Sequence, residues 1–228
     1  MFKFNNLQNM KIGILGTGIV GKTIASALIS NGHEVKIGSR SAKNEKNIAF
    51  VAMAANKNAS AGTFADAAAF GEIIFNCTAG SASLDALKLA GATNLDGKIL
   101  VDISNPLDFS KGMPPSLSVC NTNSLGEEIQ KEFPDVKVVK TLNTIWSKLM
   151  VNPSLVNYGD HNVFICGDDE AAKKVIIDLV LIPFGWLKKN IFDLGDITKA
   201  RGTEMYLSLW LSLYGTIDSG AFNVKIVR

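Results

Sequence analysis

The stretch that decides the fold is KIGILGTGIVGKTIASALISNGHEVKIGSRS, residues Lys11–Ser41. It begins with a short apolar run, passes through a glycine-rich turn into a longer helical stretch, and ends in a second short apolar run. This order is typical of a strand, a helix and a second strand. The stretch therefore predicts a βαβ unit, the building block of a parallel sheet covered by helices.

Three glycines, Gly16, Gly18 and Gly21, stand between the expected first strand and helix. In such a unit the first permits a tight turn, the second lets the backbone approach a pyrophosphate, and the third allows close helix packing. Free N–H groups and the positive end of the helix dipole then face the phosphates. We therefore predict a dinucleotide site, and not a ligand-free turn, formed by Gly16, Thr17, Gly18, Ile19, Val20 and Gly21.

The end of the second strand indicates which dinucleotide binds. NAD-binding folds usually place an Asp or Glu there, but positions 38–41 read Gly-Ser-Arg-Ser and no carboxylate follows until Glu45. A guanidinium and two hydroxyls can donate hydrogen bonds to a 2′-phosphate, which a carboxylate would repel. We predict Ser39, Arg40 and Ser41 at this phosphate, with Lys43 as a second cation, so NADP(H) is favoured over NAD(H). The alternative is a solvated arginine at a strand end.

Nearly continuous apolar runs alternate with helical stretches along most of the chain. The expected strands are Lys11–Leu15, Glu34–Ile37, Ala61–Phe64, Ile73–Cys77, Ile99–Ile103, Val136–Thr141 and Val163–Cys166. The expected helices are Gly21–Asn31, Ala42–Ala55, Ser83–Ala90, Ser124–Phe133, Asp169–Leu179 and Ile197–Tyr214. Continuous apolar runs are typical of strands covered on both faces. The pattern predicts a Rossmann-like, doubly wound α/β fold with a mostly parallel sheet and a C-terminal helical segment.

We expect this fold to form one domain over residues 1–228. Residues 10–145 would form the dinucleotide-binding core, and residues 146–228 would extend the sheet and close the acceptor site with helices. Ligands of open α/β sheets bind beyond the carboxyl ends of the strands, so later strand ends should complete the cleft. The residues predicted there are Thr78, Ala79, Gly80, Asn105, Asn143 and Thr144. Small polar residues are also common in plain turns, and Asn143 could instead cap a helix.

Composition excludes several other functions. The chain has 228 residues, a formal net charge of +2 and 47% hydrophobic residues, so it carries no charge excess of the kind that binds nucleic acid. Its longest uncharged run of note, Met205–Ile217, is too short to cross a bilayer, and we expect a cytoplasmic protein without a membrane partner. Cys77, Cys120 and Cys166 are odd in number and widely spaced, which indicates free thiols. No Cys or His spacing predicts a metal site.

No His, Lys or Cys constellation predicts a catalytic residue, and His161 is expected to be an ordinary loop residue. Hydride transfer to or from a nicotinamide fits this absence, because the cofactors carry the chemistry and the protein supplies orientation. Two alternatives stay open. One is a non-catalytic NADP(H)-binding sensor, and the other is a dehydrogenase of a small imine or hydroxy acid, which would need a proton donor.

The C-terminal helix carries Arg201 and Glu204 among apolar neighbours such as Leu207 and Trp210. One face should pack on the sheet, and another should close the acceptor site or meet a second subunit. A homodimer is therefore expected, although the core of a monomer explains the pattern nearly as well.

With these motifs the chain resembles the coenzyme F-420-dependent NADP oxidoreductases and the related cytosolic domain of the six-transmembrane metalloreductases. The matching segments are the Gly16–Gly21 turn, Gly38–Arg40, Lys140–Thr144, Gly167–Asp169 and DLGDITKARGTEMYLSLWLSL. The resemblance implies hydride transfer at C4 of nicotinamide to or from a flavin-like ring. It places Thr17–Val20 at the pyrophosphate, Ser39 and Arg40 at the 2′-phosphate, and Asn143 and Thr144 near the nicotinamide.

On the acceptor side the chain departs from the deazaflavin-using members of that family. They typically carry a Thr-Ile-Pro-like strand end where this chain has Cys77–Gly80, and often His-Thr-Ile where it has Asn143–Ile145. The segment Asn143–Ile145 is closer to the corresponding segment of the metalloreductases. The expected second substrate is therefore a small-molecule acceptor of flavin or deazaflavin type.

Overall fold

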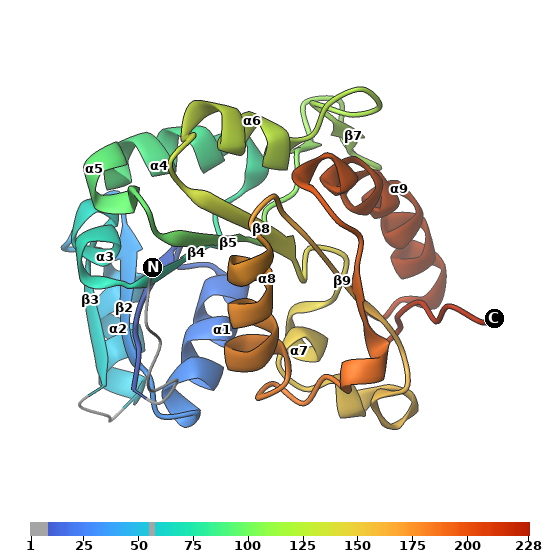
Figure 1. The fold of residues 1–228 in the computed structure, drawn as a ribbon, viewed down its shortest axis with the longest axis horizontal. Helices are drawn as coiled ribbons and strands as arrows, with labels where there is room; N and C mark the ends of the chain where they lie inside the picture. Colours follow the sequence, from blue (N-terminus) through green and yellow to red (C-terminus); the bar gives the residue numbers. More distant parts are fainter. Residues whose placement is uncertain (1–8, 55–57) are drawn as a thin grey trace.

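The structure is a computed structural model that describes residues 9–54 and 58–228 (Figure 1). An eight-stranded sheet runs through the molecule in the order β10-β9-β8-β5-β4-β1-β2-β3. Its strands are β1 (Lys11–Leu15), β2 (Glu34–Ser39), β3 (Ala59–Thr63), β4 (Ile73–Asn76), β5 (Ile99–Asp102), β8 (Lys137–Thr141), β9 (Val163–Cys166) and β10 (Ile191–Asp193). All neighbouring pairs are parallel except β8 and β9. This confirms the predicted Rossmann-like α/β class.

Helices cover both faces of the sheet (Figure 1). One face carries α1 (Ile19–Ser30), α2 (Glu45–Ala54), α7 (Ser147–Met150) and α8 (Glu170–Ile176), whose end continues as a π-helical turn over Ile177–Leu181. The other carries α3 (Phe64–Phe70), α4 (Ser83–Ala90), α5 (Ala92–Leu95), α6 (Leu125–Glu132) and the start of α9 (Ala200–Ile217). Two apolar clusters, one on each face, form the core, because the strands alternate their buried side chains between the faces.

The strand order places a topological switch point between β1 and β4. From β1 the chain winds outward through β2 to β3, then returns to start again at β4 on the other side of β1. The connections from the two halves leave a crevice at the carboxyl ends of β1 and β4, which is where ligands bind in open α/β sheets. The fold itself therefore positions the candidate site.

Several expected boundaries are confirmed to the residue, namely Lys11–Leu15, Val163–Cys166 and Ser83–Ala90. The predicted strand Ala61–Phe64 was wrong at its end, because Phe64 begins a helix that the sequence pattern did not indicate. Thr63 caps that helix: its Oγ1 accepts from the N–H of Asp66 at 3.1 Å, while the Asp66 carboxylate accepts from the N–H of Thr63 at 2.8 Å. Ala55, the expected end of the second helix, lies outside the described residues.

The expected helices Ala42–Ala55 and Ile197–Tyr214 begin three residues later than predicted, at Glu45 and Ala200. Other differences concern short elements. A two-stranded hairpin, β6 (Leu107–Asp108) and β7 (Ser116–Leu117), and the three-residue strand β10 were not expected. They are too short to show a hydrophobic period. Asp169, the expected first residue of a helix, is instead the N-cap of α8, since its Oδ1 accepts from the N–H of Ala172 at 2.8 Å. Within the described residues, no helix is long and apolar enough to cross a membrane.

Candidate nucleotide-binding site

Three adjoining pockets form one cleft along the carboxyl ends of the strands. The first pocket, of about 900 Å³, is lined from β2, the glycine turn and α4; the middle pocket, of about 250 Å³, lies beside β4 and β5; the far pocket, of about 150 Å³, lies beside β8 and α9. Thr78 and Ala79 line both the first and the middle pocket, and Val20 and Asn105 line both the middle and the far one. From β2 to β8 the cleft crosses four strand spacings, roughly 19 Å.

The three glycines of the turn meet different steric conditions, close backbone contact at Gly16 and Gly21 and open space at Gly18. Gly16 has a φ of +116°, and a Cβ there would lie 2.6 Å from the carbonyl oxygen of Cys77. A Cβ on Gly21 would lie 2.2 Å from the carbonyl oxygen of Gly16, whereas a Cβ on Gly18 would meet nothing within 4 Å. Gly18 also serves as the N-cap of α1, and no described side chain caps this helix start. The turn therefore leaves backbone N–H groups and open space to an anion.

Arg40 lies at the rim of the first pocket, beside Ser39 and Ser41. Ser39 is buried, and its hydroxyl donates to the carbonyl oxygen of Ser41 at 2.7 Å, which shapes the bend after β2. The Arg40 side chain is exposed, and none of the described carboxylates forms an ion pair with it. An exposed cation that no described carboxylate pairs with is available to an anionic ligand at this position.

A row of buried polar side chains closes the strand ends beneath the cleft. Asn76, Asp102 and Lys140 are register partners on β4, β5 and β8, so their side chains share one face of the sheet. Asp102 accepts from Asn76 Nδ2 at 2.8 Å and from Ser104 Oγ at 2.6 Å, and Thr78 Oγ1 donates to Asn76 Oδ1 at 2.6 Å. Because Thr78 and Ser104 line the middle pocket, the row is bonded directly to the cleft wall.

Lys140 joins this row to the C-terminal helix. Its Nζ lies 2.7 Å from Asp102 Oδ2, 2.8 Å from Glu204 Oε1 and 2.6 Å from the carbonyl oxygen of Ser104, so all three N–H groups have acceptors. Burial lowers the pKa of Lys140, but the Asp102 and Glu204 carboxylates outweigh burial and raise its pKa overall. Lys140 is therefore a charged structural residue and not a proton donor at neutral pH.

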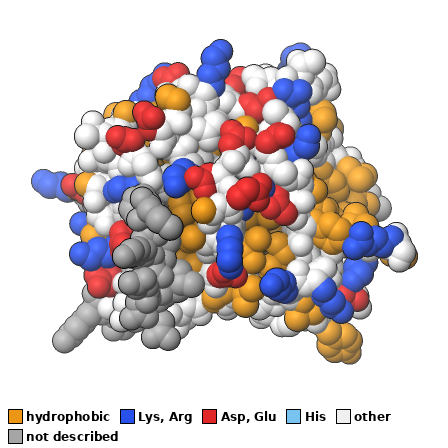
Figure 2. Space-filling model, viewed as in Figure 1, with side chains coloured by type: hydrophobic (Ala, Val, Ile, Leu, Met, Phe, Trp, Pro, Cys, Tyr) orange, Lys and Arg blue, Asp and Glu red, His pale blue; other side chains and the backbone are white. Residues whose placement is uncertain are grey.

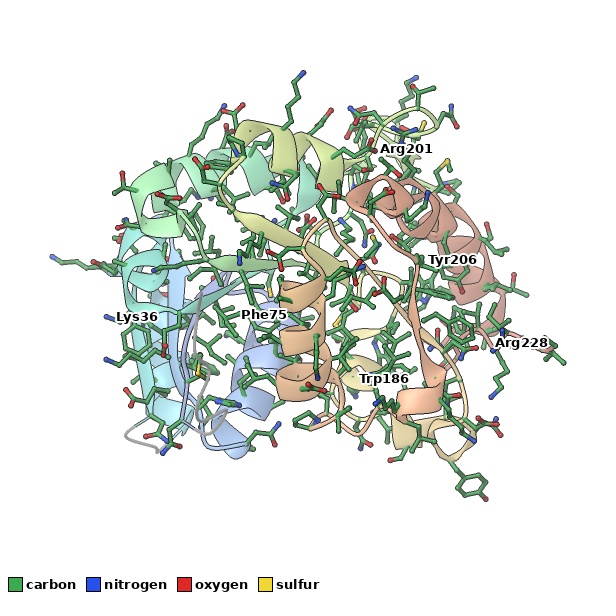
Figure 3. The ribbon with its side chains drawn as sticks, viewed as in Figure 1. Lys36, Phe75, Trp186, Arg201, Tyr206 and Arg228 are labelled. Atoms are coloured by element: carbon green, nitrogen blue, oxygen red, sulfur yellow. The ribbon has the colours of Figure 1, made fainter. Side chains whose placement is uncertain are left out.

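Glu204 sits at the junction of α9 with α6. Its carboxylate accepts from the backbone N–H groups of Leu125 at 2.8 Å and Gly126 at 3.0 Å, at the start of α6. A second tie between these helices is a bidentate pair in which Arg201 Nε and Nη2 donate to the Glu127 carboxylate. Arg201 marks the start of α9 in Figure 3. These contacts hold α9 so that Leu207 and Trp210 reach the far pocket.

Two amide side chains join the loops after β5 and β8. Asn143 Nδ2 donates to Asn105 Oδ1 at 2.9 Å, and Asn105 Nδ2 donates to the backbone oxygen of Asn143 at 2.8 Å. Both residues line the far pocket, together with Thr144. Each amide keeps one N–H hydrogen free of this pair, which is available to a carbonyl oxygen in the cleft.

The structure brings almost all of the predicted site residues to this one cleft. The cleft is lined by Gly16, Thr17, Gly18, Val20, Ser39, Arg40, Ser41, Thr78, Ala79, Gly80, Asn105, Asn143 and Thr144. Gly21 is buried behind the turn, and Ile19 points outward with 78% of its surface exposed. Lys43 is exposed close to Arg40 in sequence but does not line the first pocket.

Cys77 and His161 have no catalytic setting. Cys77 lines the cleft, but burial, followed by the charge of Asp102, raises the pKa of its thiol well above the ordinary range. His161 lies in a loop, as expected, yet it is buried: Nε2 is 2.8 Å from the carbonyl oxygen of Pro153, and Nδ1 is 2.7 Å from Asn223 Nδ2. The described residues contain no cluster of His, Cys, Asp or Glu that could hold a metal ion.

Sequence reasoning missed the roles of Asp102, Lys140 and Glu204. Asp102 is the last residue of the apolar strand β5, Lys140 is the last but one of β8, and Glu204 lies in an apolar helix. A charged residue in a run that must be buried is rarely left unpaired, which is the signal that could have found them. Their pairing could not be read from the sequence, because 38 residues separate Asp102 from Lys140.

Comparisons with known proteins identify the family of the chain. The family described as "NADP oxidoreductase coenzyme F420-dependent" matches residues 11–106. The F420-dependent NADP reductase of Methanocaldococcus jannaschii is 30% identical over 235 residues, covering 96% of this chain and 99% of the relative. Metalloreductase STEAP3 of Rattus norvegicus is also 30% identical, over 197 residues, but the chain spans only 36% of that protein.

A solved structure extends the similarity to the whole fold. A candidate F420-dependent NADP-reductase from Arthrobacter sp. FB24 is 49% identical, with a TM-score of 0.90, and the match covers 96% of this chain and 100% of that one. A reductive aminase from Aspergillus terreus in complex with NADPH is 18% identical, with a TM-score of 0.62, over 92% of this chain and 63% of its own; this likeness shows the fold alone. The chain thus belongs to the family of F420-dependent NADP oxidoreductases and is an NADP-dependent oxidoreductase.

Proposed function

We propose that the chain transfers hydride between the nicotinamide of NADP(H) and an acceptor of flavin or deazaflavin type. The observation that carries the proposal is the juxtaposition, in one cleft, of open space at Gly18 and the exposed guanidinium of Arg40, which no described carboxylate pairs with. The first fits a pyrophosphate and the second a 2′-phosphate. NADPH, when bound, supplies hydride from C4 of its nicotinamide, so the protein has to bind, orient and exclude water.

The residues that line the cleft fall into groups, each suited to a different part of NADP(H). The pyrophosphate is held at the start of α1 by Gly16, Thr17, Gly18, Ile19 and Val20. The 2′-phosphate is held by Ser39, Arg40 and Ser41. Thr78, Ala79, Gly80 and Asn105 face the ribose and nicotinamide, because their small side chains allow close approach. Asn143 and Thr144 lie at the carboxamide, where an amide both donates and accepts.

The lining of the acceptor end supports a ring acceptor over an imine or hydroxy acid. Among the described residues, those that line the middle and far pockets include no Asp, Glu, His, Lys or Arg. Reduction of an imine or a keto acid would need a positioned proton donor. A flavin or deazaflavin accepts hydride into its own conjugated ring, and the apolar walls from Leu107, Phe109, Leu207 and Trp210 suit such a ring.

A homodimer and a cytoplasmic location belong to the same proposal. Hydrophobic side chains gather over the second half of α9, on the right in Figure 2. Leu209, Tyr214 and Ile217 are among the exposed large hydrophobic residues there, which supports burial against a second copy. Cys77, Cys120 and Cys166 are free, which suits a reducing compartment.

The test is NADPH oxidation measured by stopped flow against FMN, FAD, the deazaflavin F420, a ferric chelate and a cyclic imine. We expect turnover with F420 or a flavin and none with the imine. Tight NADPH binding with no turnover on any acceptor would favour the sensor alternative. Turnover with the imine alone would favour the dehydrogenase alternative, and turnover with the chelate in the absence of flavin would contradict the ring acceptor.

A further inference from the structure

The buried charges of Asp102, Lys140 and Glu204, here called the triad, do not balance. One ammonium lies between two carboxylates, so the triad carries a net charge of −1. All three side chains are 0–1% exposed, and water does not screen them. The backbone N–H groups of Leu125 and Gly126 at the start of α6 offset part of this charge.

The triad lies directly beneath the nicotinamide end of the proposed site. Its members bond both the hydroxyl and the carbonyl oxygen of Ser104, which lines the middle pocket. Glu204 precedes Leu207, a far-pocket residue, by three positions on α9, a rise of about 4.5 Å along the helix. Asn143 and Thr144 follow Lys140 within four residues and line the same pocket. The triad is thus close to the far pocket on two sides, through Glu204 on α9 and through Lys140 on β8.

We propose that the triad stabilises the positive charge of oxidised nicotinamide and thereby favours hydride donation from NADPH. Hydride transfer breaks the C4–H bond of NADPH, moves the hydrogen and its two electrons to the acceptor ring, and leaves one positive charge on the nicotinamide. A fixed negative charge in a site shielded from water stabilises such a charge as it develops, at no cost of reorganisation. Asp102, Lys140 and Glu204 are positioning and electrostatic residues, and none of them contacts the reacting atoms.

This inference rests on the proposed nucleotide site, and its signature is a ratio of affinities that does not depend on the acceptor. NADP+ and NADPH differ only in the nicotinamide ring. NADPH carries the extra hydride at C4, and the charge and pucker of the ring change with it. A general loss of structure weakens the binding of both nucleotides, whereas removal of the buried charge weakens the binding of NADP+ selectively. The ratio of the dissociation constants, Kd(NADP+)/Kd(NADPH), therefore separates an electrostatic role from a merely structural one.

The decisive variant is Glu204→Gln, with Glu127→Gln as its matched control. Both replace a Glu by its amide at the α6–α9 junction, and both remove one negative charge. Glu127 pairs with Arg201 outside the triad, and its side chain is 16% exposed against 1% for Glu204, so solvent screens the charge lost there more strongly. By calorimetric titration we expect Glu204→Gln to raise Kd(NADP+)/Kd(NADPH) on the order of fivefold, and Glu127→Gln to leave the ratio within about twofold of wild type.

Two further measurements keep the test decisive if Glu204→Gln does not fold. Asp102→Asn removes the same charge from the other end of the triad and should move the ratio in the same direction. The wild type itself should bind NADP+ at least as tightly as NADPH. A strong wild-type preference for NADPH, or equal ratios in the triad variants and the control, would overturn the inference. A wild type that binds neither nucleotide would contradict the proposed function as well.

Discussion

Gly21 packs so closely on the carbonyl oxygen of Gly16 that a Cβ at position 21 would stand 2.2 Å from it. The contact clamps the first turn of α1 onto the end of β1. Gly18, between these two glycines, has open space in the direction of its absent side chain. The same short turn thus contains glycines needed for folding and a glycine whose space is left to a ligand.

Gly18→Val should abolish binding of both NADPH and NADH while the fold persists. The added side chain occupies the open space where the pyrophosphate would lie, and the loss should exceed about 1.4 kcal/mol, or tenfold in Kd. Stability should change by less than about 1 kcal/mol, since Val is only a poorer N-cap than Gly. Fluorescence titration and thermal melts measure the two effects, and unchanged affinity would contradict the pyrophosphate role.

Gly21→Val is the matched comparison for that variant. Its side chain would collide with backbone that cannot move away, so we expect a loss of about 1–3 kcal/mol in the free energy of unfolding. The difference between the two variants, read by urea denaturation, distinguishes the glycine that serves binding from the one that serves folding. Equal free energies of unfolding for Gly18→Val and Gly21→Val would contradict this division.

Arg40→Glu should weaken NADPH binding far more than NADH binding. The variant replaces a cation that can pair with the 2′-phosphate by an anion that repels it, and charge-assisted hydrogen bonds of this kind contribute about 1.5–3 kcal/mol each. Arg40→Met should show a smaller change in the same direction, since it removes the cation without adding repulsion. Titration of each variant with both nucleotides provides the measurement, and equal losses for NADPH and NADH would count against the assignment.

Cys77 should be dispensable for activity although it lines the cleft. Burial and the neighbouring Asp102 raise the pKa of its thiol, so the thiol stays protonated at neutral pH and is a poor nucleophile. Cys77→Ser should keep NADPH oxidation within about threefold, whereas loss of a catalytic thiolate costs several orders of magnitude. Slow labelling of Cys77 by iodoacetamide at pH 8, followed by mass spectrometry, checks the protonation state independently.

Asp169 should contribute stability at neutral pH that disappears in acid. A hydrogen bond from the N–H of Ala172 holds the pKa of this carboxyl below its ordinary value. A lowered pKa in the folded state means that the stabilisation is present above the ordinary pKa and is lost as pH falls through the folded value. Asp169→Ala should cost about 1 kcal/mol at pH 7, and the gap to wild type should narrow below about pH 4. Denaturant curves at pH 7 and pH 3 test this, with Asp169→Asn, which keeps the cap oxygen, as control.

The elements that sequence alone predicted well are those whose signals are local. Lys11–Leu15 and Val163–Cys166 are apolar runs bounded by turn residues, and the structure reproduces their limits. The capped helix from Phe64 was missed, because its start overlaps the end of an apolar run and the Thr63–Asp66 capping box went unrecognised. Hairpin β6–β7 is two residues per strand and has no period to detect.

The sequence by itself determined the glycine turn, the cation after β2 and the strand–helix alternation, because each depends on the conformation of a few consecutive residues. Only the tertiary structure decided that Asn105 meets Asn143 and that Lys140 lies between Asp102 and Glu204. Those contacts join residues far apart in the chain, and they exist because the strand order places β5 beside β8 and α9 packs against α6. A charged residue in a buried segment indicates from the sequence that it must have a partner, but the tertiary structure determines which residue that partner is.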